Sequence, residues 1–229
     1  MAQLQKLFER YDRLVIFDTE TTGLHFNRDE IIEFAAAVVE CRDGQAQVIE
    51  EYDELITLSP GGFIPPMIQD LTGITNEAVQ ARGIPKTRLC CDIARMIAGN
   101  TLLLAYNAHF DLSFLYYLLL RDGDPTILRG KDKLDLLTVY RDRRSYPHKL
   151  CSAIEAYGLQ DQVVNSHRAV DDVLATVAVM LAMEQEWDDL HNYVNLFGYI
   201  PKFGIDGKAI GSVTYKPQPY DSPVPLYQK

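Results

Sequence analysis

The stretch LVIFDTETTGL, residues 14–24, decides the fold. It opens with a short apolar run at 14–17, which is typical of a strand buried on both faces. If the strand continues, Asp18 and Glu20 point to the same face, because successive side chains of a strand alternate. Two carboxylates that face the same way at the end of a buried strand repel each other unless a cation lies between them. The alternative is that Asp18 caps a turn and Glu20 is solvated.

The second acidic segment is AYNAHFDLSFL, residues 105–115. On a helix, Asp111 shares its face with Phe114, Leu115 and Leu118. A carboxylate on an apolar face needs a partner, because unpaired burial costs on the order of several kcal/mol. The alternative is that Asp111 caps the helix and needs no cation.

The third acidic segment is SHRAVDDVLATVAVM, residues 166–180. If it is helical, Asp172 has apolar neighbours on its own face, among them Ala175 and Val179. His167 precedes Asp172 by five positions, on a loop or a first turn, although a single histidine is more often structural. Spacing does not choose between Asp171 and Asp172, since both have apolar surroundings.

Together these segments give four inward carboxylates, at Asp18, Glu20, Asp111 and Asp172. Four buried acids that converge without cations would be strongly destabilising, so a two-metal site is the simplest account. Carboxylate oxygens suit Mg²⁺ or Mn²⁺ better than they suit zinc.

The pattern along the chain predicts an α/β fold with a mixed sheet. Apolar runs favour strands, and apolar periodicity favours helices. A helix is the alternative for 33–39. A tail rich in proline and glycine, residues 201–229, follows the main domain at 1–200. The expected strands are 14–17, 31–39, 47–58, 101–105 and 133–135, and the expected helices are 66–71, 75–81, 86–98, 109–121, 136–142, 149–157 and 173–183.

Composition narrows the class of protein. The net charge of −10 argues against binding of nucleic acid through bulk phosphate neutralisation, although an enzyme that binds divalent cations is often acidic. The four cysteines form no C-x-x-C pair, which favours a reducing compartment. No apolar stretch approaches the ~20 residues of a membrane span. We therefore expect a cytoplasmic protein with no membrane partner.

The three acidic motifs, in this order, resemble those of the DEDD exonuclease superfamily. The histidine in the last motif indicates the DEDDh branch, and the DTETTGL run is most similar to the epsilon proofreading subunits of bacterial DNA polymerase III. Two further matches lie between the motifs, at 64–75 and at 133–137. The resemblance covers roughly residues 11–185.

The resemblance implies a ribonuclease H-like fold, with a mixed five-stranded sheet flanked by helices. It implies that Asp18, Glu20, Asp111 and Asp172 bind two Mg²⁺ or Mn²⁺ ions, and its register selects Asp172 over Asp171. His167 would be the general base, since the imidazole pKa is ordinarily near ~6.5. Six residues match positions that cradle the terminal nucleotide: Thr21, Thr22, Gly23, Leu24, Asn107 and Phe110.

The activity implied is 3′→5′ exonucleolytic hydrolysis of single-stranded or frayed DNA, releasing 5′-mononucleotides, in proofreading or repair. The partners implied are the 3′ end of a DNA strand and a DNA polymerase subunit. Three alternatives remain open at this point: an RNA-trimming exoribonuclease, a non-catalytic polymerase-associated subunit that binds nucleic acid, and a protein that only binds divalent cations.

Overall fold

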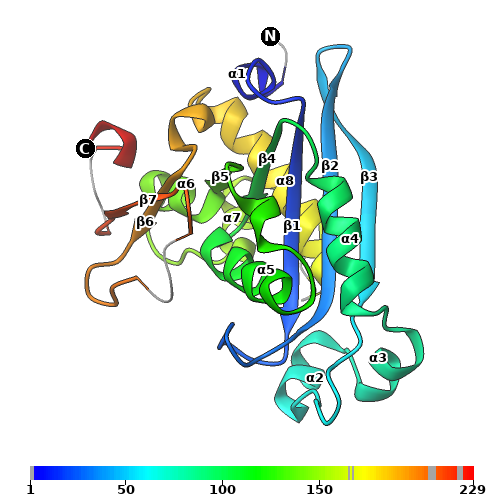
Figure 1. Ribbon diagram of the computed structural model, residues 1–229. Helices are drawn as coiled ribbons and strands as arrows, with labels where there is room; N and C mark the ends of the chain where they lie inside the picture. Colours follow the sequence, from blue (N-terminus) through cyan, green and yellow to red (C-terminus); the bar gives the residue numbers. More distant parts are fainter. Residues whose placement is uncertain (1–2, 165, 167, 206–209, 221–223) are drawn as a thin grey trace.

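A five-stranded sheet forms the centre of the computed structural model, which describes residues 3–164, 166, 168–205, 210–220 and 224–229 (Figure 1). The strand order is β3-β2-β1-β4-β5. The β1–β2 and β2–β3 pairs are antiparallel, whereas β1–β4 and β4–β5 are parallel. The predicted α/β fold with a mixed sheet is confirmed. The strands are β1 (Arg13–Thr21), β2 (Ile31–Arg42), β3 (Gln45–Leu55), β4 (Thr101–Ala105) and β5 (Asp132–Asp135).

Segment 33–39 is a strand, not a helix, because it lies in β2 between β1 and β3 with both of its faces buried. On the face toward α8, its side chains include Ala35 and Ala37, which are fully buried. These small side chains let the helix lie close to the sheet, where it contacts both β1 and β2.

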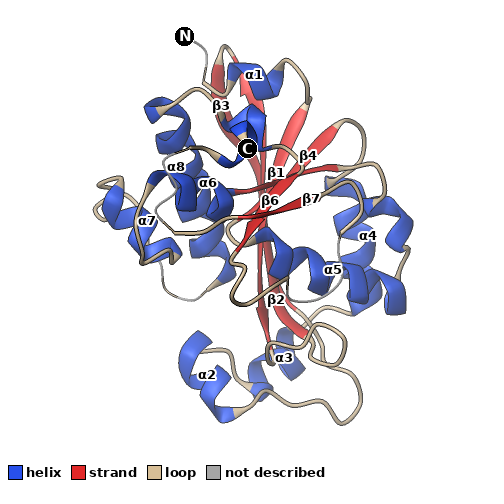
Figure 2. Ribbon diagram, turned by 90° about the vertical axis from the view of Figure 1, so that its left-hand side faces the viewer, coloured by secondary structure: helices blue, strands red, loops and turns tan. Residues whose placement is uncertain are grey.

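Helices cover both faces of the sheet (Figure 2). One face is covered by α4 and α5, and the other by α6, α7 and α8. The small helices α2 and α3 lie beyond the lower end of β2 and β3 in Figure 1. No helix in the described part of the chain is long and apolar enough to cross a membrane. The helices are α1 (Gln5–Phe8), α2 (Pro66–Thr72), α3 (Asn76–Arg82), α4 (Lys86–Met96), α5 (Ala108–Asp122), α6 (Leu136–Arg143), α7 (Leu150–Ala156) and α8 (Ala169–Glu186), with 3₁₀ turns η1 (Pro125–Leu128), η2 (Leu190–Tyr193) and η3 (Leu226–Gln228).

Strand β1 divides the core into two apolar clusters. Leu14 and Ile16 pack with α8, while Val15 and Phe17 pack with α4 and α5. The alternation of side chains along the strand therefore continues into Asp18 and Glu20 on the α8 side, with Thr19 on the α5 side. This places the first acidic motif where helices from both layers reach it.

The described part of the 201–229 segment packs against the domain. Strand β7 (Thr214–Pro217) pairs in parallel with β6 (Leu196–Tyr199). The Gln218 side chain donates to the carbonyl of Thr138 at 2.7 Å, and Leu226 is fully buried. The Tyr215 hydroxyl lies 2.6 Å from Nδ1 of His109, at the start of α5. A domain boundary at residue 200 stays a prediction.

Candidate metal centre

Three carboxylates meet at the end of β1. Asp18 and Glu20 come from the strand, and Asp172 comes from the first turn of α8. Their ligand oxygens all lie within 4.8 Å of one another. The alternative in which Asp18 caps a turn and Glu20 is solvated is therefore wrong, because β1 continues to Thr21 and keeps both side chains on one face.

This grouping makes ionisation costly. Burial raises the pKa of Asp18 well above its ordinary value, and the neighbouring charges of Asp111, Asp172 and Glu20 raise it further. Burial, then Asp172, raises the pKa of Glu20 to about 8. A divalent cation would reverse this effect, since it favours the charged form of every carboxylate around it.

Asp111 approaches from the opposite layer, on α5. Its Oδ1 accepts hydrogen bonds from the Thr19 backbone N–H at 3.0 Å and from the Thr19 hydroxyl at 2.7 Å. Burial raises its pKa to about 7, although the bonds from Thr19 lower it. Asp111 is not within the 4.8 Å group, yet its charge acts on Asp18. It therefore lies beside the three acids, held by the residue between Asp18 and Glu20.

The helix cap proposed for Asp111 is wrong. The residue that caps α5 is Asn107, in the left-handed conformation with φ of 68°, so the helix starts at Ala108. Asp111 stands in the first turn, where its carboxylate accepts hydrogen bonds from Thr19 on β1. Asparagine tolerates this backbone conformation better than most residues.

The donor set fits a hard divalent cation. All three grouped ligand atoms are carboxylate oxygens, and they lie close enough to bind a single ion. Asp111 adds a fourth carboxylate next to Asp18. Of the four acids that the sequence predicts as ligands, the structure groups three directly. The number of ions and the role of Asp111 as a ligand stay predictions.

Glu33 is a functional residue that the sequence reasoning missed. It is fully buried on β2, directly opposite Glu20 in the strand register. Its carboxylate accepts from Nε of Arg168 and from the N–H of Ala169, both at 2.8 Å, and pairs with Nη2 of Arg168. It thereby fixes the first residue of the helix that carries Asp172. A single acid within the apolar run 31–39 was the available signal.

The third motif divides its two adjacent acids between two environments. Asp172 is buried and joins the cluster, while Asp171 is half-buried and accepts from the Ser166 hydroxyl. The selection of Asp172 from the family register agrees with this geometry. His167 lies outside the described residues, and its role as general base stays a prediction.

The predicted nucleotide-binding residues of the first motif form the turn after β1. The Thr21 hydroxyl donates to the carbonyl of Gly23 at 2.6 Å, and the Thr22 N–H donates to the carbonyl of Glu30 at 2.9 Å. At Gly23, a β-carbon would collide with the Asp29 carboxylate. Leu24 is 74% exposed. The turn thus presents one apolar side chain to solvent beside the acids.

Two further predicted residues flank the start of α5. Asn107 is exposed at the helix cap. Phe110 is half-buried and packs on Phe114, with ring centroids 4.9 Å apart. Both lie next to Asp111 in the chain. Their contact with a nucleotide stays a prediction.

Similarity to known proteins agrees with this geometry. A family of proteins described as Exonuclease, of the RNase T type, matches residues 15–180, which include all four acids. The chain belongs to this exonuclease family. None of the comparisons tests its relation to the histidine-containing branch or to the epsilon subunits, so both stay predictions.

Two bacterial relatives illustrate the similarity. DNA polymerase III of the PolC type from Clostridium perfringens is 32% identical over 171 residues, or 74% of this chain and 11% of the polymerase. The 3′-5′ exonuclease DinG of Bacillus subtilis is 32% identical over 174 residues, or 74% of this chain and 17% of DinG. The chain thus spans only a small part of the length of these relatives.

Solved structures share the ribonuclease H-like exonuclease fold. Escherichia coli Exonuclease I in complex with a dA16 oligonucleotide gives a TM-score of 0.69 at 24% identity, over 80% of this chain and 42% of that chain. Exonuclease I from Methylocaldum szegediense gives 0.67 at 22% identity, over 79% of this chain and 42% of that chain.

The raised pKa of Glu20 predicts a pH-dependent stability. The ordinary value is 4.5 and the folded value about 8, so the metal-free protein loses stability as pH rises through this window. Glu20→Gln removes that loss. Its melting temperature at pH 8 without metal should exceed that of the wild type by a few degrees, and the gap should close toward pH 4.5. Scanning calorimetry measures this, with the exposed Glu51→Gln on β3 as control. Equal melting temperatures at pH 8 would contradict the repulsion.

Because Glu33 is buried, we expect its contribution to stability to depend strongly on Arg168. We expect Glu33→Gln to lower the free energy of unfolding by about 1–3 kcal/mol, because a weaker acceptor then faces the guanidinium and the Ala169 N–H. A double-mutant cycle with Arg168→Met should give a coupling above about 1 kcal/mol. The exposed Glu50–Arg95 pair is the matched control, where the coupling should stay within about 0.2–1 kcal/mol. Equal coupling free energies in the two cycles would show that Glu33 does not stabilise the start of α8.

Proposed function

We propose that this chain is a metal-dependent 3′→5′ exonuclease that hydrolyses the terminal phosphodiester bond of single-stranded or frayed DNA. The observation that carries the proposal is the convergence of Asp18, Glu20 and Asp172, with Asp111 beside them. Acids with pKa values raised by burial and mutual repulsion are typical of functional sites. Their grouping inside a folded chain is otherwise unfavourable.

The four carboxylates would hold two divalent cations, Mg²⁺ or Mn²⁺. Bound cations of this kind activate a water for in-line attack and stabilise the departing oxygen. The protein residues orient the reaction: Thr19 fixes Asp111, and Glu33 fixes the start of α8 and thereby Asp172. In this proposal His167 takes the proton of the attacking water.

The substrate assignment rests on the turn after β1 and on the start of α5. The exposed side chain of Leu24 and the half-buried ring of Phe110 offer apolar surface to the terminal base. Thr21, Thr22, Gly23 and Asn107 offer backbone and polar groups to its sugar and phosphate. The Bacillus relative is named a 3′-5′ exonuclease, and the E. coli neighbour was solved with a DNA oligonucleotide. Both favour a DNA strand as the substrate.

The biological setting that we propose is proofreading or repair. The PolC-type relatives are DNA polymerases by name. This favours a polymerase subunit as a partner of the chain. RNA trimming requires the same acids, so single-stranded RNA is digested in parallel with DNA.

Digestion of end-labelled strands tests the proposed activity. The wild type with Mg²⁺ or Mn²⁺ should shorten 5′-labelled single-stranded DNA from its 3′ end and release 5′-mononucleotides, and EDTA should abolish this. Asp18→Asn with Glu20→Gln should reduce turnover by at least about 10³-fold while the fold is kept. Glu51→Gln is the control and should act as the wild type does. Full activity of the double variant refutes the site. Internal cuts in a circular single strand, which has no ends, refute the exonuclease activity itself. A strong preference for short RNA moves the substrate to RNA.

Replacement of His167 tests the general base. His167→Ala should lower turnover by about 10²–10⁴-fold, because the attacking water then loses its general base. Binding of Mn²⁺ should change little, since the four carboxylates remain. Turnover, Mn²⁺ affinity and melting temperature are measured on the same variant. Near-normal turnover with a lowered melting temperature would make His167 structural and remove it from the mechanism.

A further inference from the structure

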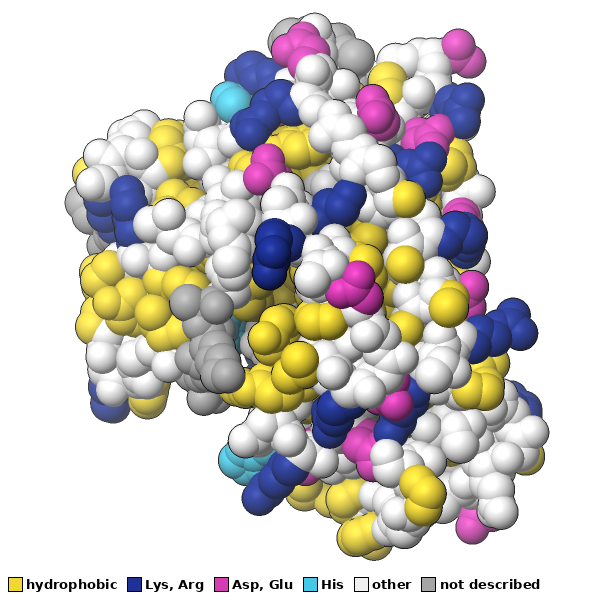
Figure 3. Space-filling view, in the orientation of Figure 1, with side chains coloured by type: hydrophobic (Ala, Val, Ile, Leu, Met, Phe, Trp, Pro, Cys, Tyr) yellow, Lys and Arg dark blue, Asp and Glu magenta, His cyan; other side chains and the backbone are white. Residues whose placement is uncertain are grey.

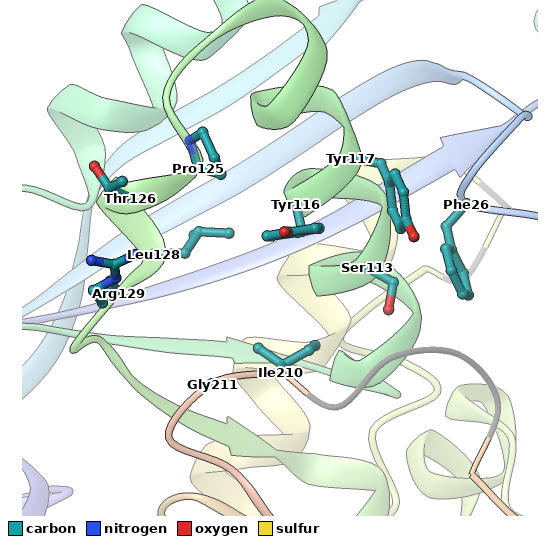
Figure 4. Close-up of a pocket in the computed structure, with 10 residues that line it drawn as sticks. All are labelled: Phe26, Ser113, Tyr116, Tyr117, Pro125, Thr126, Leu128, Arg129, Ile210 and Gly211. Carbon is teal, nitrogen blue, oxygen red and sulfur yellow. The ribbon is translucent and has the colours of Figure 1, made fainter.

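A cavity of about 340 Å³ lies beside α5, outside the acidic cluster (Figure 4). Tyr116 lies near its centre. Tyr117 and Phe26 lie on one side, and Leu128 and Arg129 lie on the other. Ile210 closes a third side. Its lining is thus aromatic and apolar, with one cation at the edge.

A series of ring contacts joins Phe110 to the aromatic lining of this cavity through Phe114, which is buried in the core. The Phe110 ring packs on Phe114 at 4.9 Å, and Phe114 meets Phe26 edge to face at 6.5 Å. Phe26 stacks on Tyr117 at 5.3 Å, and Tyr117 meets Tyr116 at 5.5 Å. Phe110 is the residue before Asp111, so the series starts one position from this acid on α5.

The length of this series corresponds to a few nucleotides. Phe110 and Tyr117 are seven positions apart on α5, which is about 10 Å along a helix that rises ~1.5 Å per residue. Stacked bases are spaced by about 3.4 Å. A strand whose last base lies at Phe110 would therefore reach the cavity about three nucleotides upstream.

Cationic groups lie where the backbone of such a strand would pass. Arg129 is exposed at the cavity edge, where its charge also acts on Asp124. Arg121 is also exposed, and its Nε donates to the carbonyl of Tyr117. The space-filling view shows Lys and Arg side chains between hydrophobic ones on this side of the molecule (Figure 3).

We propose that this cavity binds a nucleobase two to four positions upstream of the 3′ end, stacked on Tyr116, with Arg129 near the adjoining phosphate. The inference rests on the proposed exonuclease function and adds an upstream subsite to it. Stacking on an aromatic ring accepts every base, because each base has a π-face. The subsite therefore gives affinity for single strands without sequence preference.

The C-terminal segment completes this subsite. Ile210 and Gly211 line it, and both lie beyond residues 15–180, which the exonuclease family covers. The buried Lys133 holds them, since its Nζ donates to the carbonyl of Gly211 at 2.9 Å and to the Ser212 hydroxyl at 3.0 Å. The upstream subsite is therefore a feature of this chain and is not supplied by the family domain alone.

Substrates of different length test the subsite. The p-nitrophenyl ester of thymidine 5′-monophosphate has no upstream nucleotide, whereas dT12 reaches the cavity. Tyr116→Ala and Arg129→Ala should raise KM for dT12 about tenfold, with kcat within twofold of the wild type, and should leave hydrolysis of the ester unchanged. In the wild type, KM should fall from dT2 to about dT5 and then level, and Tyr116→Ala should remove this dependence.

Two controls separate stacking from damage to the fold. Tyr116→Phe keeps the ring and should keep the KM of the wild type for dT12. Leu120→Ala, 52% exposed on the same helix, should not change it either. An unchanged KM for dT12 in both Tyr116→Ala and Arg129→Ala overturns the subsite. An equal loss of kcat/KM on dT12 and on the ester also overturns it. A wild type that hydrolyses neither substrate refutes the proposed function itself, and the subsite with it.

Discussion

Repulsion among the carboxylates at the end of β1 is the interaction on which the rest of the structure depends. Burial alone raises the pKa of Asp18, and its acidic neighbours raise it again. A chain with this cluster must supply compensation nearby, or bind a cation, or protonate the acids. The sheet and its two helical layers are arranged so that β1, α5 and α8 each bring an acid to one point.

The pattern of internal compensation separates acids that support the site from acids that are available to a ligand. Glu33 has Arg168 and the Ala169 N–H. Asp111 is intermediate, because Thr19 gives it two donors while burial still raises its pKa to about 7. Glu20 receives only a weak opposing contribution from Arg168, and its pKa rises to about 8. The protein thus satisfies the acids that hold its elements together and leaves the charge at the end of β1 to be balanced by something it binds.

Local pattern was enough to predict the sheet and the acids that lie on regular elements. An apolar run followed by alternating acids places Asp18 and Glu20 on one face. Helical spacing left Asp171 and Asp172 equivalent, and only the family register selected Asp172. Local pattern did not predict the role of Glu33, because its partner Arg168 lies 135 positions away. It also did not predict whether Asp111 caps its helix or accepts hydrogen bonds from Thr19. These depend on which elements become neighbours, and periodicity does not contain that information. The docking of Gln218 and Leu226 on the domain was hidden for the same reason.

A chain with an acidic net charge needs local groups to bind a polyanion. With a net charge of −10, bulk release of counterions contributes little to affinity. Bound cations at the carboxylates would reverse the charge where the scissile phosphate lies. The rings of Phe110 and Tyr116 would hold the terminal base and an upstream base by stacking. Stacking is far less sensitive to salt than phosphate contacts are. A chain built in this way would release each mononucleotide readily, because its hold on the strand comes from bases upstream of the bond that is cut.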